Sequence, residues 1–465
     1  MNARPIAVVV LAAGLGTRMR SARAKVLHEL AGRPLLHYPL RALRALAPAR
    51  VVLVVGHQAD LVRAAAAAVS DGLETVLQAE QRGTGHAVRC AMGALAGFEG
   101  DVVVLYGDVP LIRGETLAAL ADAHRRHDAA LTLLTAHCAD PTGYGRIVRD
   151  GTGRVERIVE ERDASPAERA ITEINPGFYC IRSDVLEPAL GRLRPSNAQA
   201  ELYLTDVVGM VAQAGGRVES VCVSDPGEVA GINTRAELAA MERRMRASLV
   251  ERFMAAGVTF EDPATAYLGD EVEIGADTVI GPNVILRGRT RIGAGCRLEG
   301  TNFLADTTVG DGVQVLFGTV ADGAEIGPGS RIGPFARLRP GTRLGANVHI
   351  GNFVETKKAV VGDGTKANHL TYLGDCEIGP DTNVGAGTIT CNYDGFKKSV
   401  TRIGARVQIG SDTQLVAPVS VGDDAYVGAG TTVTKNVPAG SLAVSRTPMR
   451  VVSGWTARKR KKEGA

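Results

Sequence analysis

Aromatic residues are scarce in this chain of 465 residues, in which Phe, Trp and Tyr together make up 4%. Together with 56 glycines, this shortage suits thin β-helix coils, whose corners need glycine and whose narrow interior favours aliphatic side chains. Net charge is also small, and a value of +3 at pH 7 argues against a general nucleic-acid binder. The length predicts two or three domains, and 45% hydrophobic with 22% charged residues is typical of globular proteins.

Cysteines and long apolar runs are few as well. The seven cysteines contain no C-x-x-C pair, so we expect reduced thiols in a cytoplasm and no zinc site. The apolar run Ile6–Ala13 is too short to span a bilayer and leads into a glycine turn, which predicts a buried strand and not a signal peptide. The basic tail Arg458–Lys462 fits a solvated, disordered end better than a site for acidic partners.

An aliphatic residue recurs at every sixth position through much of the second half. These positions are Ile274, Ile280, Leu286, Ile292, Leu298 and Leu304, then Ile326, Ile332, Leu338, Leu344 and Ile350, then Ile403, Ile409, Leu415, Val421 and Val427. The period fits neither a helix nor a flat sheet, and it predicts a parallel β-helix of stacked coils. The rhythm is interrupted around Lys357–Tyr372 and Asn392–Lys398, which we interpret as loops that carry chemistry.

The first half alternates short β-branched runs, such as Val51–Val55 and Val102–Leu105, with helix-like stretches. This alternation predicts an α/β domain with a mostly parallel sheet and ligands at the carboxyl ends of its strands. The segment 235–256 has no Gly or Pro and predicts one charged helix, ended by Gly257. The expected organisation is therefore a first domain over 1–235, a linker helix over 236–256, and a β-helix domain with a basic tail over 257–465.

A glycine turn, Gly14-Leu15-Gly16, follows the first predicted strand. Its amide groups can hold phosphate oxygens, and Arg18 and Lys25 add positive charge. The Walker sequence and the third glycine of a dinucleotide fingerprint are both absent. A strand-to-helix turn without a ligand remains an alternative at this point.

Two further stretches accompany this turn. Asp108 directly follows a predicted strand, where it can hold Mg²⁺, although a turn aspartate explains the residue equally well. The polar segment Gln78–Ala87 predicts only a glycine-bearing loop.

The β-helix half contains a His-, Lys- and Tyr-bearing segment at its first interruption. We interpret it as an exposed loop on which an acyltransferase places its catalytic groups. His369 is the candidate base for an amine acceptor, since histidine has a reference pKa of about 6.5. A histidine with a purely structural hydrogen bond is the alternative, and solvated surface charge is the alternative for the neighbouring Lys and Arg residues.

These stretches together resemble one family of enzymes. The matching segments are LAAGLGTRM, AKVLHEL, LQAEQRGTGHA, LYGDVPL, PTGYGRIV, EIN at Glu173–Asn175, and Gly231-Ile232-Asn233. They are similar to the bifunctional N-acetylglucosamine-1-phosphate uridyltransferase / glucosamine-1-phosphate N-acetyltransferase family, over the whole chain. The resemblance implies a Rossmann-like nucleotidyltransferase domain joined by a linker helix to a left-handed parallel β-helix of hexapeptide repeats.

The resemblance also implies an activity and its partners. The family acetylates glucosamine 1-phosphate with acetyl-CoA and then transfers UMP from UTP to N-acetylglucosamine 1-phosphate, releasing pyrophosphate. Its product, UDP-N-acetylglucosamine, supplies peptidoglycan and lipopolysaccharide synthesis in the cytoplasm. Mg²⁺ is the implied metal, with Asp108 and Asn233 as its ligands, and a homotrimer is the implied assembly.

The implied site residues fall into three groups. The UTP and UDP-sugar group is Leu11, Ala12, Ala13, Gly14, Arg18, Lys25, Gln78, Gly83, Thr84, Tyr106, Gly107, Asp108, Gly145, Glu160, Asn175 and Asn233. The group for the amino sugar phosphate is Arg339, Lys357, Tyr372, Asn383 and Lys398, with His369 as general base. The acetyl-CoA group is Ala386, Asn392, Tyr393, Ser411, Ala429 and Arg446.

Three positions depart from the family pattern. Ala24 stands where Pro is expected, Pro176 where a small hydroxyl residue is expected, and Thr234 where a second Asn is expected. We expect the first change to be neutral and the third to leave the metal ligand intact, whereas Pro176 stiffens a sugar-contacting loop.

Two other functions compete with this one. In a nucleotidyltransferase whose β-helix is only regulatory, as in the glucose-1-phosphate adenylyltransferases, replacement of His369 would be harmless. A non-enzymatic β-helix protein would have no use for the glycine turn and Asp108 of the first half.

Overall fold

The computed structural model describes residues 4–70 and 72–462. The chain forms two compact units, residues 1–245 and 246–465, which are described separately. Among the described residues, no helix is both long and apolar enough to cross a membrane.

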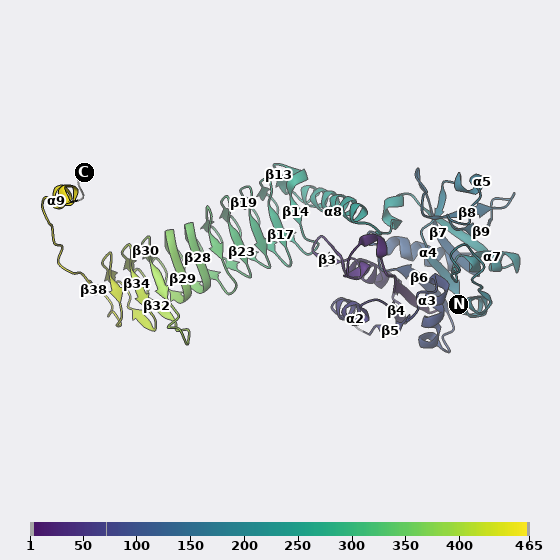
Figure 1. Cartoon of the computed structure of the whole chain (residues 1–465), viewed down its shortest axis with the longest axis horizontal. Helices are drawn as coiled ribbons and strands as arrows, with labels where there is room; N and C mark the ends of the chain where they lie inside the picture. Colours follow the sequence, from purple (N-terminus) through teal and green to yellow (C-terminus); the bar gives the residue numbers. More distant parts are fainter. Residues whose placement is uncertain (1–3, 71, 463–465) are drawn as a thin grey trace. The chain divides into compact units, whose positions relative to one another are not determined.

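The first unit is an α/β domain around a ten-stranded mixed sheet (Figure 1). Its strands, with the separate β2–β3 hairpin, are β1 (Ile6–Ala12), β2 (Glu29–Leu30), β3 (Arg33–Pro34), β4 (Arg50–Val55), β5 (Glu74–Leu77), β6 (Asp101–Tyr106), β7 (Leu131–His137), β8 (Gly145–Arg149), β9 (Val155–Val159), β10 (Glu173–Asn175), β11 (Tyr179–Arg182) and β12 (Val218–Val223). Its α-helices are α1 (His37–Ala42), α2 (Ala59–Ala67), α3 (Thr84–Met92), α4 (Gly114–Arg126), α5 (Pro166–Arg169), α6 (Ser183–Arg192) and α7 (Asp206–Gln213), and α8 (Arg235–Ala255) continues into the second unit.

The strand order of this sheet is β5-β4-β1-β6-β11-β7-β10-β8-β9, with β12 beside β7. The first four strands are parallel, which brings the carboxyl ends of β1 and β6 to one edge. Strand β1 is buried along its whole length, as the sequence predicts for Ile6–Ala13. The expected α/β fold is confirmed, and the antiparallel pairings lie in the half of the sheet that begins at β11.

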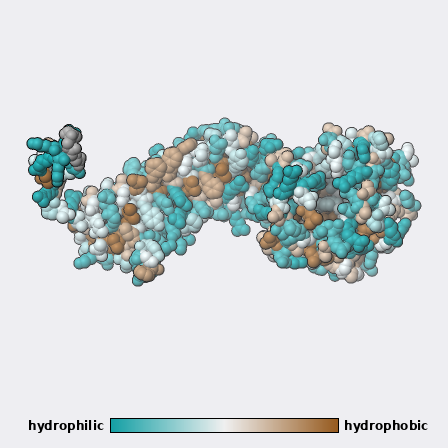
Figure 2. Space-filling view, viewed as in Figure 1, coloured by the Kyte–Doolittle hydropathy of each residue, from teal (hydrophilic) through white to brown (hydrophobic). Residues whose placement is uncertain are grey.

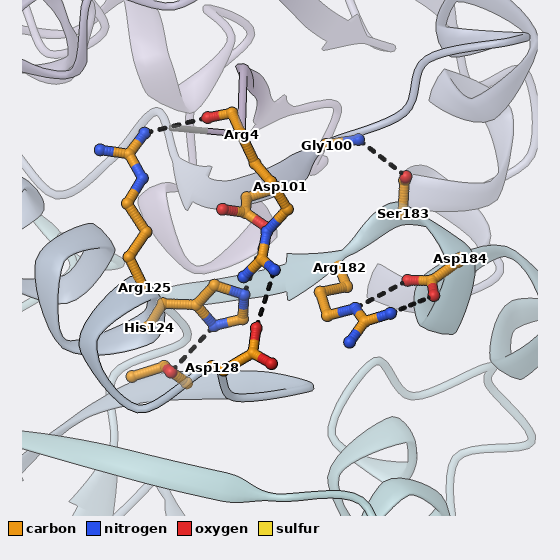
Figure 3. A network of polar contacts seen from close by, with 10 residues as sticks. Arg4, Gly100, Asp101, His124, Arg125, Asp128, Arg182, Ser183 and Asp184 are labelled. Carbon is orange, nitrogen blue, oxygen red and sulfur yellow. Dashed lines mark hydrogen bonds and ion pairs between the residues drawn. The ribbon is translucent and has the colours of Figure 1, made fainter. Parts of the chain in front are cut away.

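A polar network lies at the opposite edge of the same sheet (Figure 3). The buried carboxylate of Asp101, the first residue of β6, accepts a hydrogen bond from Arg4 at 2.9 Å. The buried His124 of α4 bonds the Thr132 hydroxyl at 3.0 Å. Arg4 also reaches Asp128 at 2.8 Å. Nε2 of His124 lies 3.4 Å from Oδ1 of Asp101, so the first residue of β6 contacts both Arg4 and α4.

Helix α8 has well-defined ends. Thr234 and Glu237 form reciprocal bonds, since the Glu237 amide donates to Oγ1 of Thr234 and the Glu237 carboxylate accepts from the Thr234 amide. At the other end, Val258 N–H donates to Phe253 O and Gly257 N–H to Met254 O, while Gly257 has φ +91°. Thr234 therefore caps the helix, and Gly257 ends it as predicted.

The second unit is a parallel β-helix of 26 strands (Figure 1). They are β13 (Thr259–Phe260), β14 (Tyr267–Leu268), β15 (Glu273–Ile274), β16 (Val279–Ile280), β17 (Ile285–Arg287), β18 (Arg291–Ile292), β19 (Arg297–Leu298), β20 (Phe303–Ala305), β21 (Thr308–Val309), β22 (Gln314–Val315), β23 (Val320–Asp322), β24 (Glu325–Ile326), β25 (Arg331–Ile332), β26 (Arg337–Leu338), β27 (Arg343–Leu344), β28 (His349–Val361), β29 (Lys366–Ile378), β30 (Asn383–Val384), β31 (Ile389–Cys391), β32 (Thr401–Ile403), β33 (Gln408–Ile409), β34 (Gln414–Val416), β35 (Val419–Val421), β36 (Tyr426–Val427), β37 (Thr432–Val433) and β38 (Leu442–Ala443). A last helix, α9 (Trp455–Lys462), follows, so the basic tail Arg458–Lys462 is exposed as predicted but helical, and the prediction of a disordered end is wrong there.

Three short strands make one coil through most of the β-helix, so that a short strand usually pairs in parallel with the third strand after it, whereas the long strands β28 and β29 pair with each other. The repeating aliphatic residues point inward. Leu286, Leu298 and Leu304, for example, are fully buried. Burial of such a side chain stabilises the coil by about 1.5–3 kcal/mol. The aliphatic residue at every sixth position is therefore a core residue of the β-helix. The predicted β-helix is confirmed.

The first predicted interruption of the repeat is not a loop. The residues of Lys357–Tyr372 lie on β28 and β29 and the short turn between them, and these two strands pair in parallel. Thr356 occupies the inward position, where it is fully buried and bonds the hydroxyl of Thr342 at 2.9 Å. The next aliphatic position of the repeat, Val361, pairs with Leu344 of the coil before and follows Thr356 after five residues. The aliphatic signal is therefore lost while the coil continues, and the prediction of an exposed loop here is wrong.

The second interruption, Asn392–Lys398, is a loop. Tyr393 and Lys398 form an antiparallel bridge across it, and Phe396 at its tip is 97% exposed. The loop lengthens its coil, since Cys376 of one coil pairs with Thr401 of the next. The prediction of a loop at Asn392–Lys398 is confirmed.

Candidate functional sites

The glycine turn after β1 brings its backbone close to Lys25. Gly16 has φ +61°, and a Cβ there would lie 2.7 Å from the Cβ of Lys25. Open space surrounds the corresponding position of Gly14. Gly107 N–H, just after β6, donates to Leu11 O at 2.9 Å. The turn and the end of β6 are thus joined at the carboxyl edge of the parallel strands, where α/β sheets bind ligands.

A cavity of about 520 Å³ opens at this edge. Its size suits a nucleotide, since ligand pockets of about 300–1,000 Å³ are usual. Predicted residues that line it are Leu11, Ala12, Ala13, Gly14, Lys25, Gln78, Gly83, Thr84, Tyr106, Asp108 and Asn233. The structure therefore brings together segments from five different parts of the chain.

The predicted uracil-side residues are held by contacts within their own segment and with residue 202. Gln78 is buried, and its Nε2 donates to Gly83 O at 3.2 Å. Gly83 has φ +101°, and a Cβ there would lie 2.6 Å from Leu202 O. Thr84 begins α3, so the glycine-bearing loop predicted over Gln78–Ala87 ends at Gly83 and its last residues are helical. The helix forms there because no Gly or Pro follows Gly85 within it.

Three polar side chains from different segments meet beside Tyr106. The ammonium group of Lys25 contacts Oδ2 of Asp108 at short range and Oδ1 of Asn233 at 3.1 Å. Ile232 N–H donates to Asp108 O at 3.1 Å, which fixes the segment of Asn233 beside Asp108. These carboxylate and amide oxygens are the two predicted Mg²⁺ ligands.

The predicted sugar-side residues form a second group. Gly145 pairs with Asn175 between β8 and β10, and a Cβ at Gly145 would lie 3.5 Å from Oε2 of Glu160. Thr205 donates to Oε1 of Glu160 at 3.0 Å, and burial raises the pKa of Glu160. Burial also raises the pKa of Tyr106. The side-chain amide of Asn175 forms hydrogen bonds within the protein, because its Nδ2 donates to the Tyr179 hydroxyl at 2.7 Å and its Oδ1 accepts from Gly177 N–H at 3.1 Å.

A neighbouring cavity of about 460 Å³ extends from Tyr106, Asp108 and Asn233 toward Arg18 and Pro176. The predicted residues Gly107, Gly145, Glu160 and Asn175 do not line either of the two cavities at this edge. Pro176 does line one, so its rigid ring borders the sugar side of the site. Ala24 N–H donates to Gln58 Oε1 at 2.8 Å, a hydrogen bond that a proline at position 24 could not form.

Candidate acetyl-transfer residues align along one corner of the β-helix, one coil apart. His369 pairs with Asn352 of the coil before. Gly387 N–H donates to Leu370 O at 2.8 Å, Asp412 N–H to Ala386 O at 2.7 Å, and Gly430 N–H to Ser411 O at 2.8 Å. His369, Ala386, Ser411 and Ala429 therefore occupy one column, although the sequence separates them by up to 60 positions. Arg446 Nη2 donates to Ala429 O at 3.5 Å, at the end of that column.

The predicted sugar-phosphate residues do not all lie together in one chain. Arg339 is bonded to Glu355 at 2.8 Å, and its N–H donates to Thr356 O one residue before Lys357. Direct contact with Lys398 lowers the pKa of Lys357, so these two cations are neighbours. Tyr372 pairs with Glu355, the residue that binds Arg339, and its side chain is partly exposed on the outer side of that face.

Asn383, by contrast, lies on the strand column of His349 and Lys366, which is a different face of the β-helix. One chain therefore divides the predicted set between two faces, with His369 at the corner between them.

The loop 392–398 sits over the same coils. Asn392 donates to Asp375 at short range, and Ser399 N–H donates to Asn392 O at 2.9 Å. The Tyr393 hydroxyl donates to Gly395 O at 2.6 Å. Hydrogen bonds thus fix the base of the loop that carries Asn392, Tyr393 and Lys398.

Sequence reasoning missed several residues of these sites. Gly177 has φ +91°, and a Cβ there would lie 2.2 Å from the Tyr106 ring, so only glycine allows this packing. Gln81 and Glu201 line the nucleotide cavity. Asn368 precedes His369, and its Oδ1 is buried without a hydrogen-bond partner among the described residues. Gln81 lies in the segment LQAEQRGTGHA and Asn368 in the interruption Lys357–Tyr372, so attention to these segments could have identified both. No local sequence pattern marks Glu201.

Comparison with known proteins agrees with this two-part organisation. Residues 8–174 match the family described as the MobA-like NTP transferase domain. Residues 323–358 and 401–435 match the bacterial transferase hexapeptide (six repeats) family. The first match covers the glycine turn and Asp108, and the second covers coils on both sides of His369.

Relatives match both halves at once. The chain is 52% identical over 457 residues to the bifunctional protein GlmU of Pelobacter propionicus, with 98% of this chain and 99% of that protein covered. It is 51% identical over 454 residues to that of Trichlorobacter lovleyi, with 98% of each covered. For Mycolicibacterium gilvum the identity is 50% over 459 residues, covering 98% of this chain and 92% of the relative. A likeness of this extent shows that the chain belongs to the GlmU family of bifunctional proteins.

Proposed function

We propose that the two halves of this chain catalyse two successive steps of UDP-N-acetylglucosamine synthesis. The β-helix half acetylates glucosamine 1-phosphate with acetyl-CoA. The α/β half then transfers UMP from UTP to the resulting N-acetylglucosamine 1-phosphate, and pyrophosphate leaves. The product supplies the synthesis of peptidoglycan and lipopolysaccharide.

The uridylyl step relies on position and charge. The sugar phosphate oxygen attacks the α-phosphorus of UTP in line with the departing pyrophosphate, so no side-chain nucleophile is needed. The glycine turn supplies amide groups for the phosphates, and Arg18 and Lys25 supply positive charge. Gln78, Gly83 and Thr84 border the uracil, and the family resemblance assigns the sugar side to Gly145, Glu160 and Asn175, which lie behind the residues that line the two cavities.

Mg²⁺ is the metal that fits this site. Asp108 and Asn233 direct oxygen atoms at one point, and Mg²⁺ prefers oxygen ligands. The described residues contain no cluster of three His, Cys, Asp or Glu side chains that could hold a metal alone. This agrees with a Mg²⁺ ion that takes its other ligands from phosphates and water. When bound, the ion neutralises charge on the reacting phosphates.

In the acetyl step, His369 removes the proton from the attacking amine. The amine nitrogen of glucosamine 1-phosphate forms a bond to the thioester carbon, the C–S bond breaks, and coenzyme A leaves as its thiol after taking up a proton. Arg339, Lys357 and Lys398 bind the phosphate, with Tyr372 and Asn383 beside the sugar. The small residues Ala386 and Ala429 let the acetyl-CoA arm lie along the column from His369 to Arg446.

We further propose that the β-helix acts as a homotrimer with acetyl-transfer sites between subunits. The division of the predicted sugar-phosphate residues between two faces supports this, because a neighbouring copy can complete the set. The three faces also differ in chemistry. On one face Arg291 forms an ion pair with Glu273 at 3.3 Å, and Arg402 forms one with Glu377 at 3.2 Å. This self-neutralised face is polar and suits contact with solvent.

Apolar side chains gather instead on the face of Tyr372. Its outward column includes Phe303, Val320 and Ile389, all more than a third exposed, and Arg337 and Glu355 stand between Val320 and Tyr372. Figure 2 shows apolar surface, tan to brown, over coils of the β-helix. Exposed apolar surface of this kind marks an interaction site, and a second copy of the chain is the partner that we assign to it.

The corner beside this face carries an apolar ladder, defined here as Phe317, Phe335, Phe353 and Leu370. The ring centroid of Phe335 lies 5.5 Å from that of Phe317 and 5.7 Å from that of Phe353. Phe335, Phe353 and Leu370 have positive φ, at corners where Asp, Asn or Gly is the usual choice. Bulky exposed residues in this strained conformation point to a function outside the monomer fold. The ladder ends directly beside His369, so contact between copies and assembly of the site are linked.

Phe353→Asp will separate the copies and lower acetyl transfer, because it places a charge in the ladder. Asp tolerates φ +55° better than Phe, so the variant chain will still fold. Light scattering will show the change from three copies to one copy of 48.6 kDa, with uridylyl transfer retained. The matched control is Val360→Asp, at a 48% exposed valine on the self-neutralised face. A Phe353→Asp protein that stays trimeric would refute the role of the ladder.

We also place the enzyme in the cytoplasm. All seven cysteines are free thiols, which supports a reducing compartment. Both substrates of the second step are phosphorylated metabolites, and their use agrees with this location.

The observation that carries the proposed function is that each half assembles its own set of groups: the glycine turn, Lys25, Asp108 and Asn233 meet in the first half, and the second half carries the column of His369. Two assays test it directly. UTP with N-acetylglucosamine 1-phosphate will release pyrophosphate, and acetyl-CoA with glucosamine 1-phosphate will release a free thiol. An enzyme that performs only the first reaction would be a nucleotidyltransferase with a regulatory β-helix.

A further inference from the structure

The Lys25 ammonium group lies where the uridylyl site needs a metal cation. It contacts Oδ2 of Asp108 and lies 3.1 Å from Oδ1 of Asn233. The side chains of Lys25 and Asp108 are only 15% and 13% exposed, so solvent screens this pair weakly. Asn233 is neutral, so among these three residues only Lys25 offers a positive charge to the carboxylate of Asp108.

The lysine and a divalent ion compete for the same oxygen atoms. A metal bound by Asp108 and Asn233 would stand against the ammonium group at contact distance, and two cations there repel. The carboxylate has a single negative charge to offset them. The pair therefore has two arrangements, one with the ammonium group and one with the metal, and each excludes the other.

The released side chain has a place to go. The stem of Lys25 lies against the glycine turn, since a Cβ at Gly16 would be 2.7 Å from the Cβ of Lys25. Gly14, Gly16 and Thr17 line the same cavity as Lys25. A flexible lysine stem can thus move its charge from Asp108 to a phosphate held by this turn without a change in the backbone.

We propose that Lys25 holds the cation position in the nucleotide-free enzyme and leaves it for the triphosphate when the metal arrives with the nucleotide. The part concerning the nucleotide rests on the proposed uridylyl transfer. The exchange makes metal binding depend on the nucleotide, because only the nucleotide offers the displaced ammonium group a new anionic partner. It also keeps Asp108 and Asn233 in position while the site is empty.

The competition is tested with Mn²⁺ alone, titrated into the full chain without nucleotide and followed by its paramagnetic resonance signal. Lys25→Met will bind Mn²⁺ about tenfold more tightly than the parent, equivalent to about 1.4 kcal/mol. The double variant Lys25→Met with Asp108→Asn will lose this gain, which assigns it to the Asp108 site. Arg20→Met, which removes an exposed cation next to the same turn, is the matched control and will bind Mn²⁺ like the parent.

A purely structural ion pair predicts the reverse result. In that case removal of Lys25 would loosen Asp108, and Mn²⁺ affinity would stay equal or fall, which would overturn the proposal. Lys25→Gln provides a second variant if Lys25→Met folds poorly, because the amide can still donate to Asp108 while the charge is gone. Circular dichroism of each variant will establish that it is folded.

A second arm adds UTP. Lys25→Met will bind the Mn²⁺–UTP complex more weakly than the parent, although it binds Mn²⁺ alone more tightly. This reversal identifies a charge that moves from the metal position to the nucleotide, and tighter binding in both arms would contradict the move. If UTP does not bind the parent at all, the proposed uridylyl function fails, while the Mn²⁺ arm still decides the competition.

Discussion

His369→Ala will lower acetyl transfer by about two to four orders of magnitude, the contribution usual for a general base. Uridylyl transfer will persist, because His369 belongs to a different compact unit from the nucleotide cavity. The reason for the loss is geometric. His369 is exposed at the corner of a rigid coil, and its column continues through Ala386, Ser411 and Ala429. The histidine is thus held at the end of the surface along which acetyl-CoA is proposed to lie.

The measurement is thiol release from acetyl-CoA at saturating glucosamine 1-phosphate. His349→Ala is the matched control, since His349 lies on the neighbouring coil and outside the proposed set of site residues. Added imidazole will restore part of the activity of His369→Ala by accepting the amine proton in place of the side chain. Unchanged acetyl transfer in His369→Ala would remove the general-base assignment and would favour a structural role for the histidine. Light scattering will establish whether the variant keeps the proposed trimeric state.

Local patterns in the sequence account for the scaffold and for the segments that meet at its sites. Inward Leu, Ile and Val residues mark the coils because burial selects them, and the glycine turn and Asp108 stand out because each follows a buried strand. The loop 392–398 was also predictable, since an insertion breaks the period.

The sequence could not show how Thr356 continues a coil. A threonine satisfies the inward position through its bond to Thr342, one coil before, and such a partner is invisible in a search for aliphatic residues. Five-residue steps have the same effect on the rhythm. The site residues were identified by resemblance, and their roles remain predictions.

Long-range contacts were also beyond local patterns. Lys25 and Asp108 are separated by 83 positions and meet only because β1 and β6 are adjacent parallel strands. The apolar ladder depends on the lengths of successive coils, which bring Phe335 and Phe353 to the same corner. Both features follow from three-dimensional register, so they appear first in the structure.

Asp108→Asn will reduce uridylyl transfer by about three orders of magnitude or more, since it removes the one carboxylate of the proposed Mg²⁺ site and its neutralising effect on the reacting phosphates. Acetyl transfer will be unaffected, because Asp108 lies in the first compact unit. Pyrophosphate release from UTP and N-acetylglucosamine 1-phosphate measures the loss, and Asp122→Asn on the exposed side of α4 is the control. Higher Mg²⁺ concentrations will recover little activity, because the amide offers the ion no charge. Full recovery at high Mg²⁺, or a loss of acetyl transfer as well, would show that Asp108 acts in another way, through the fold and not through the metal.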